Sequence, residues 1–132
     1  MPDLDALTAA LDDRDDLRLA VLFGSQATGD AQPTSDIDLG VLPHDGASPR
    51  LSILQAELSR AAGGTVDLVD MESAPPLLRF KIAQRGKPLL MRDRADWVRF
   101  RRRAMVDWYD WQPTARRMWA QYRRSLRETT SG

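Results

Sequence analysis

The sequence predicts an α/β (α+β) fold in which helices flank a small mixed β-sheet. Residues 17–23, 37–41 and 65–71 are apolar, either continuously or at alternate positions, as expected for strands with buried faces. Longer segments between and after them carry apolar residues three and four positions apart, which is helical spacing. The length of 132 residues suits one domain with a modest core.

The first predicted helix precedes the first strand. Asp3 can cap the N-terminus of this helix, and leucines follow at helical spacing. An acidic cluster over residues 12–16 ends it. The apolar run over residues 17–23 then predicts a buried strand, which Gly24 ends.

The second strand lies between two loops. Residues 24–35 are rich in Gly, Ser, Thr, Asp and Pro, so we expect a loop with room for one helical turn. Apolar side chains at 37, 39 and 41 alternate with polar or small residues, which indicates a strand with one buried face. Pro43 to Pro49 forms the next loop.

The middle of the chain repeats the helix–strand pattern. Leucines at helical spacing over residues 51–62 predict a helix that Gly63 closes, and an alternating strand follows over residues 65–71. Pro75 suits the first turn of another helix. Residues 88–91 are expected to form a short edge strand.

Two helices are expected at the C-terminus. A long helix begins near Asp96, and Pro113 either breaks it or starts the next. We therefore divide the single domain into a catalytic core, residues 1–95, and C-terminal helices, residues 96–128, that pack on the core, on a partner or on both. Aromatic residues form a stripe on the first helix that should cover the sheet: Trp97, Phe100, Trp108 and Trp111.

Two further features of these helices leave alternatives open. On the second helix, Trp119 and Tyr122 can pack on the core or contact a partner. The arginines at positions 99 and 101–103 can form a solvated helix face, or they can contact phosphates or an acidic partner.

The composition excludes several classes of site. Without cysteine there is no disulfide, thiolate metal site or cysteine nucleophile, and the single histidine, His44, cannot form a zinc-binding cluster. We expect His44 at the surface rather than as a catalytic base. The sequence has no Walker A or Gly-x-Gly-x-x-Gly motif, signal peptide or membrane-spanning run, so a cytoplasmic protein is expected.

Charge is distributed unevenly along the chain. Residues 1–72 carry 14 Asp and Glu against 4 Arg, a net charge of −10. Residues 73–132 carry 15 Lys and Arg against 5 acidic residues, a net charge of +10. The acidic half is compatible with a metal-dependent site, and the basic half with phosphates or an acidic partner. Attraction between the two halves within the fold is the alternative explanation, and it can account for part of the split.

The segment from Gly24 to Asp38 carries the chemistry. Gly24-Ser25 follows a strand, where backbone N–H groups and a hydroxyl can hold a phosphate. Asp36 and Asp38 point to the same face of the next strand, with Cα atoms roughly 6.5–7 Å apart. If the second and third strands pair, Asp67 completes a group of three carboxylates.

Three clustered carboxylates repel one another unless a cation lies between them. Carboxylate oxygens are preferred ligands of Mg²⁺, and two such ions would activate a hydroxyl and neutralise a triphosphate. Taken singly, Gly-Ser is an ordinary turn and Asp-x-Asp is common at solvated strand edges; their combination on consecutive strands is more specific. Asp70 is the rival to Asp67, which we favour because Leu68 is then buried with Val66.

These residues resemble a known family signature. Gly24-Ser25, ten further residues and then Asp36-x-Asp38 are similar to the GSx10DxD motif of the DNA polymerase β-like nucleotidyltransferases. The third strand, residues 66–70, resembles the third-carboxylate strand of the minimal nucleotidyltransferases, the MNT group. The stretch 108–113 is similar to the C-terminal part of MNT antitoxins.

The resemblance implies a polymerase-β-like fold and an MntA-type antitoxin that works with a HEPN-domain toxin ribonuclease. Such antitoxins transfer AMP from ATP to a tyrosine of the toxin. Asp36, Asp38 and Asp67 would be the catalytic, Mg²⁺-binding residues, and Gly24 and Ser25 would hold the nucleotide phosphates. A hetero-oligomer with the toxin is expected; contact with a membrane or direct binding of nucleic acid is not.

Two alternatives remain at this point. The chain can be an antitoxin that acts by binding alone, with an idle site, or a nucleotidyltransferase for a small-molecule acceptor. About 130 residues barely form a catalytic core, which favours an acceptor delivered by a docked protein. A dimer could still build a small-molecule pocket between its subunits.

Overall fold

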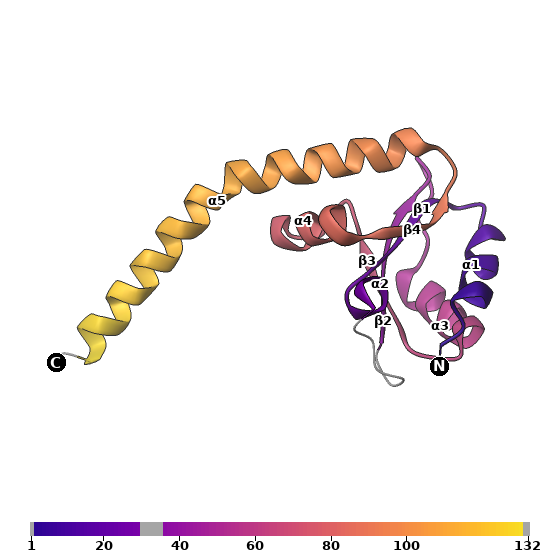
Figure 1. Cartoon of the computed structure of the whole chain (residues 1–132), viewed down its shortest axis with the longest axis horizontal. Coiled ribbons are helices and arrows are strands. Elements are labelled where there is room, and N and C mark those ends of the chain that lie inside the picture. Colours follow the sequence, from indigo (N-terminus) through magenta and orange to yellow (C-terminus); the bar gives the residue numbers. More distant parts are fainter. Residues whose placement is uncertain (1, 30–35, 131–132) are drawn as a thin grey trace.

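A computed structural model describes residues 2–29 and 36–130. Its nine elements alternate between helices and strands along the chain (Figure 1). Their bounds are α1 Leu4–Asp12, β1 Leu17–Phe23, α2 Ser25–Thr28, β2 Ile37–Pro43, α3 Leu51–Ala62, β3 Val66–Asp70, α4 Pro76–Arg85, β4 Lys87–Met91 and α5 Arg94–Thr130. The one helical turn expected after Gly24 is α2; the part of that loop over residues 30–35 lies outside the described residues.

The four described strands form one mixed sheet in the order β3-β2-β1-β4. β1 is antiparallel to both β2 and β4, whereas β2 and β3 are parallel and are joined by the crossover helix α3. This arrangement confirms the predicted small mixed sheet flanked by helices. It also brings the start of β2 beside the start of β3 and the end of β1.

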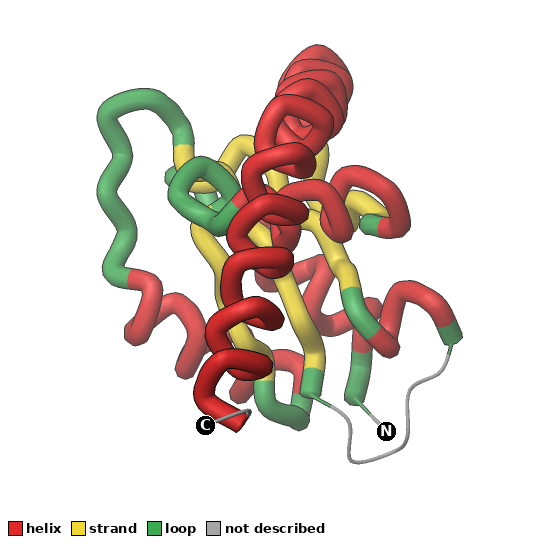
Figure 2. Tube along the Cα trace, turned by 90° about the vertical axis from the view of Figure 1, so that its left-hand side faces the viewer, coloured by secondary structure: helices red, strands yellow, loops and turns green. Residues whose placement is uncertain are grey.

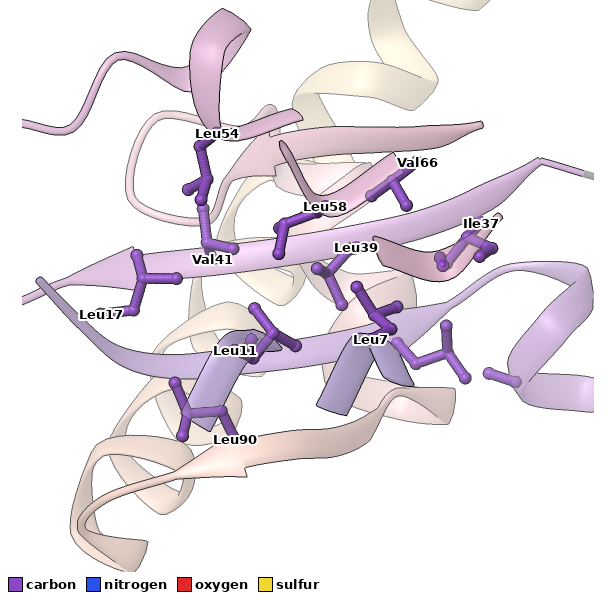
Figure 3. Packing of buried hydrophobic residues seen from close by; sticks show 14 residues of the cluster. Leu7, Leu11, Leu17, Ile37, Leu39, Val41, Leu54, Leu58, Val66 and Leu90 are labelled. Carbon is purple, nitrogen blue, oxygen red and sulfur yellow. The ribbon is translucent and has the colours of Figure 1, made fainter. Parts of the chain in front are cut away.

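Helices cover both faces of the sheet, which explains why β1 is buried along nearly its whole length. In Figure 1, α1 and α3 lie on one side, and α4 and the first part of α5 lie on the other. Figure 3 shows the core on the α1/α3 side, where leucines of the two helices meet Ile37, Leu39 and Val41 of β2. Side chains on the other face of the sheet pack against α4 and α5, among them Val21, Leu42 and Val69.

Local signals in the sequence determine where several elements begin and end. The Ala6 backbone N–H donates a 3.0 Å hydrogen bond to Asp3 Oδ1, which caps α1 as predicted. Gly63, with φ of +68°, closes α3 in the left-handed conformation that glycine adopts readily.

The C-terminal part of the chain differs from the expectation of two helices. α5 is a single helix of 37 residues that continues through Pro113. Proline has no N–H to donate to the carbonyl of Tyr109, so it bends this helix without ending it (Figure 1). None of the described helices is both long and apolar enough to cross a membrane.

The aromatic stripe of α5 covers the sheet only near its start, contrary to expectation. Phe100 and Ala104 are buried in the core between the sheet and α4, with Trp97 packed against it. Trp108 instead stacks on Phe80 of α4, with ring centroids 5.3 Å apart. Beyond this point α5 leaves the sheet.

Candidate active site

Two of the predicted carboxylates lie side by side on neighbouring strands. Asp38 of β2 is paired in register with Asp67 of β3, and on its other side Asp38 is opposite Phe23 of β1. Directly paired residues project from the same face of a sheet. The strand pairing on which the three-carboxylate prediction depended is therefore present.

The structure also shows how Asp67 and its rival Asp70 differ. Val66 and Leu68 pack on the α1/α3 side, so Asp67 points to the opposite face, together with Asp38. Asp70 serves the local backbone, because its Oδ1 accepts a 3.0 Å hydrogen bond from the N–H of Glu72. The choice of Asp67 over Asp70 agrees with this geometry.

Asp36 lies two residues before Asp38 and is exposed. Its charge is near enough to affect Asp38: burial raises the pKa of the Asp38 carboxyl, and repulsion by Asp67 and by Asp36 raises this pKa further. The three carboxylates thus form one interacting acidic group at the end of the sheet where β2 and β3 begin.

These carboxylates have the oxygen chemistry that suits Mg²⁺. Within residues 2–29 and 36–130, no three acidic or histidine side chains converge closely enough to hold a metal ion together. Like charges push such side chains apart, and a cation between them removes this repulsion. The residue types, and the shared face of Asp38 and Asp67, fit a magnesium site.

Two constraints explain why the residue directly after β1, Gly24, is a glycine. Its φ is +72°, and a Cβ at this position would collide with Asp38 Oδ2. The carbonyl of Gly24 accepts hydrogen bonds from the N–H groups of Ala27 and Thr28, at 3.1 and 3.2 Å, which forms the single turn α2. Glycine therefore permits both the tight turn and close approach of the chain to Asp38.

Ser25 is the first residue of α2 and is half-buried. Its hydroxyl has no hydrogen-bond partner among the residues that the structure describes. Gly24 is thus beside Asp38, and Ser25 follows it as the first residue of α2; the contact of both residues with phosphate remains a prediction.

A cavity of about 480 Å³ adjoins this turn. Phe23, Gly24 and Thr28 line one side, and α4 lines the other with Leu78, Lys81, Gln84 and Arg85. Lys81 and Arg85 were not among the site residues predicted from the sequence. Their spacing of four residues places them on one face of α4, but the sequence does not show that this face lies against α2.

The other residues considered in the sequence lie elsewhere. His44 is exposed, as expected, and follows the end of β2 that is opposite to Asp38. Arg99 and Arg103 line a cavity of about 330 Å³ near the C-terminal ends of β2 and β3, with Arg79 and Asp96. Arg99 and Arg103 are largely exposed. Arg99 lies 3.7 Å from Asp96 and Arg103 lies 3.9 Å from Asp107, both on α5, so these arginines do not belong to the carboxylate site.

Comparison with known proteins identifies the class of this domain. The family described as Polymerase beta, Nucleotidyltransferase matches residues 5–95, more than half of the chain. The chain therefore belongs to this nucleotidyltransferase family.

A curated relative lies within this class. The chain is similar to the protein adenylyltransferase MntA of Shewanella oneidensis, with 39% identity over 75 residues, which are 55% of this chain and 53% of that protein. The alignment thus spans about half the length of the relative.

Solved structures extend the similarity to α5. A crystal structure of a toxin–antitoxin with AMP-PNP has a TM-score of 0.78 at 27% identity, covering 90% of this chain and 97% of that chain. A tri-AMPylated Shewanella oneidensis HEPN toxin in complex with an MNT antitoxin gives a TM-score of 0.70 at 24% identity, covering 90% and 98%. The polymerase-β-like fold is confirmed.

Proposed function

We propose that this chain is an antitoxin-type protein adenylyltransferase that transfers AMP from ATP to a tyrosine hydroxyl of a HEPN toxin. The register of Asp38 with Asp67, beside Gly24, carries the proposal because it creates an acidic centre next to a cavity. The name of the curated relative supports the reaction, and the toxin–antitoxin structure with AMP-PNP supports the nucleotide and partner.

In this proposal, each group at the site has a role. Asp36, Asp38 and Asp67 would hold Mg²⁺, which neutralises charge on the triphosphate and promotes attack by a hydroxyl. Lys81 and Arg85 offer positive charge to the phosphates from the side of α4. Phe23 and Leu78 give the same cavity an apolar surface on which a nucleobase can pack.

The transfer balances without a further reactant. The tyrosine oxygen bonds to the α-phosphorus of ATP, the bond from this phosphorus to the bridging oxygen breaks, and pyrophosphate leaves with the electron pair. The hydroxyl proton passes to a site carboxylate or to water. ATP is abundant in the cytoplasm, where we place the protein.

The position of an isotopic label in ATP distinguishes transfer of AMP from transfer of the γ-phosphate. The full chain is incubated with its cognate HEPN toxin, Mg²⁺ and ATP labelled on either the α- or the γ-phosphate. We expect the toxin to become labelled only from the α-position, and the label to disappear when the acceptor tyrosine is changed to Phe. Label from the γ-position would instead indicate phosphoryl transfer.

Two other functions give different results in the same assay. An antitoxin that acts by binding alone silences the toxin without transferring label. A nucleotidyltransferase for a small acceptor labels a small hydroxyl or amine compound when no protein partner is present.

A further inference from the structure

The end of α5 presents an apolar surface that the described chain does not cover. We call residues 114–130 the outer segment. Every side chain from 116 to 127 is exposed, including Met118 at 60%, Trp119 at 54% and Tyr122 at 54%. Trp119 and Tyr122 stack on each other, with ring centroids 5.5 Å apart. The sequence left packing or partner contact open for these two residues, and the structure shows no packing on the core.

This surface continues the buried side of the same helix. Phe100 and Ala104 face the core, and apolar residues follow them at intervals of three and four positions: Trp108, Trp111, Ala115, Met118, Tyr122 and Leu126. At about 100° per residue these positions stay on one side of the helix. We call Met118, Trp119 and Tyr122 the apolar stripe. The stripe continues the side of α5 on which Phe100 and Ala104 face the core, but no part of the described core packs against it.

Arginines flank the apolar stripe on one side. Arg116 and Arg123 lie near Trp119 around the helix, and the Arg123 guanidinium lies 5.5 Å from the centre of the Trp119 ring. Arg117 and Arg124 lie on the side opposite the stripe. None of these four arginines forms an ion pair with a residue that the structure describes.

The outer segment extends toward the end of the molecule that carries the acidic site. Figure 2 looks at the sheet from the α5 side and shows α5 passing in front of it toward the end where β2 begins. Figure 1 shows the same segment bent toward this end, well apart from the sheet. Asp38 and Asp67 lie on the sheet face that α4 and α5 cover.

We infer that the apolar stripe and its flanking arginines are the docking surface for the acceptor protein. The occupant is a HEPN toxin surface of apolar residues bordered by carboxylates, so the inference rests on the proposed function. Binding along the outer segment holds the toxin while its tyrosine reaches the carboxylate site, and this supplies the positioning that a protein acceptor needs.

Charge favours this occupant over a second copy of the chain. Two outer segments packed together would each bring five arginines and one glutamate, and the charges would repel. In the crystal structure of a toxin–antitoxin with AMP-PNP, one chain aligns with 90% of this chain, so a chain of similar length occurs in such an assembly. Packing of the outer segment on the acidic half of another copy is the competing arrangement that the experiment must exclude.

The affinity of the full chain for its cognate HEPN toxin, measured without ATP, tests the inference. Met118→Glu/Tyr122→Glu should weaken binding about 100-fold, because aromatic and apolar anchors contribute most to such interfaces. Ala120→Glu is the control for added negative charge: it places one carboxylate, against two in the stripe variant, on the side of the same segment away from the stripe, and affinity should stay within about threefold. Circular dichroism checks that the helix forms in each variant.

A second pair of variants tests the contribution of the arginines to toxin binding. Each variant replaces two arginines by glutamates, and the two variants differ only in the side of the helix that is changed. Arg116→Glu/Arg123→Glu should weaken binding about tenfold or more, whereas Arg117→Glu/Arg124→Glu should have a much smaller effect. At saturating toxin the stripe variant should still transfer AMP, so its KM for toxin rises more than its kcat falls.

The outcomes separate this inference from the proposed function. Wild-type affinity in the stripe variant overturns the docking surface while leaving AMP transfer intact. A wild-type dimer that the stripe variant dissociates, with unchanged toxin affinity, assigns the surface to a second copy and also overturns it. Loss of toxin binding in the stripe variant, when the wild-type complex transfers no AMP, supports the docking surface and rejects the proposed reaction.

Discussion

Gly24 lies so close to Asp38 that a Cβ on residue 24 would overlap Asp38 Oδ2. This contact links the turn after β1 to the acidic pair formed by Asp38 and Asp67. The distance between the turn and the carboxylates is therefore set by a residue without a side chain.

Substitution of Gly24 tests this contact. Gly24→Ala must displace Asp38, so we expect the rate of AMP transfer to fall about 100-fold or more. Gly63→Ala is the control, because Gly63 also has a positive φ, of +68°, but a Cβ there meets nothing within 4 Å. Gly63→Ala should lose about 1–2 kcal/mol of stability from its left-handed backbone, and Gly24→Ala should lose more, because φ of +72° with ψ of −153° is a conformation that essentially only glycine adopts. With both variants assayed folded, only Gly24→Ala should lose the activity. Equal activity in the two variants would contradict the role of the contact.

Stability should depend on pH through Asp38. The pKa of this carboxyl is raised by burial first and by Asp67 and Asp36 next, so the folded state holds the proton more tightly than the unfolded state. Its contribution to stability is therefore present at low pH and is lost as the pH rises from the unfolded pKa through the folded pKa.

Asp38→Asn removes this repulsion. Near neutral pH we expect its free energy of unfolding to exceed that of the wild type by about 0.2–1 kcal/mol. The difference should vanish below about pH 3, where the carboxyl is protonated in both states. Urea unfolding at the two pH values measures it, and a variant that is less stable near neutral pH would show that the repulsion is unimportant.

Magnesium should stabilise the folded chain if the acidic group binds it. At about 100 times its Kd, Mg²⁺ would add about 2.7 kcal/mol to the wild type, seen as a higher unfolding temperature. Asp36→Asn/Asp67→Asn should abolish this gain. Asp13→Asn/Asp15→Asn removes the same charge from exposed residues after α1 and should keep it. An equal response in both variants would indicate general screening of charge.

The cavity beside Gly24 predicts the contribution of Lys81 and Arg85. Lys81→Ala and Arg85→Ala should each weaken ATP binding about tenfold, because each removes a charge that can contact phosphate. Arg102→Ala, an exposed position on α5, serves as the control. Calorimetry with ATP and Mg²⁺ measures the affinities, and unchanged binding in both α4 variants would place the nucleotide elsewhere.

Local patterns predicted the sheet and the acidic group. Alternation in β2 placed Ile37, Leu39 and Val41 on the buried side, which puts Asp38 on the other. The same alternation in β3 favoured Asp67 over Asp70, because Val66 and Leu68 had to face the core. The predicted sheet faces of Asp38 and Asp67 agree with the structure because the period of a strand fixes the direction of each side chain; their catalytic role stays a prediction.

Features that depend on tertiary packing could not be predicted. Lys81 and Arg85 line the cavity only because α4 packs beside the turn at Gly24. The helix break expected at Pro113 was wrong, because a helix can lose one hydrogen bond and bend when the residues on either side favour it. The outer segment's exposure followed from where α5 leaves α4, which no local pattern specifies.

The most direct test of the proposed function is the intact mass of the cognate HEPN toxin after incubation with the chain, ATP and Mg²⁺. With the wild type we expect a gain of one or more AMP units. With Asp38→Asn we expect none, whereas Asp70→Asn, on the other face of β3, should behave as the wild type. An unmodified toxin that is nevertheless silenced in a stable complex, or equal AMP transfer by Asp38→Asn, would contradict the assignment of Asp38 and Asp67 as the centre of the reaction.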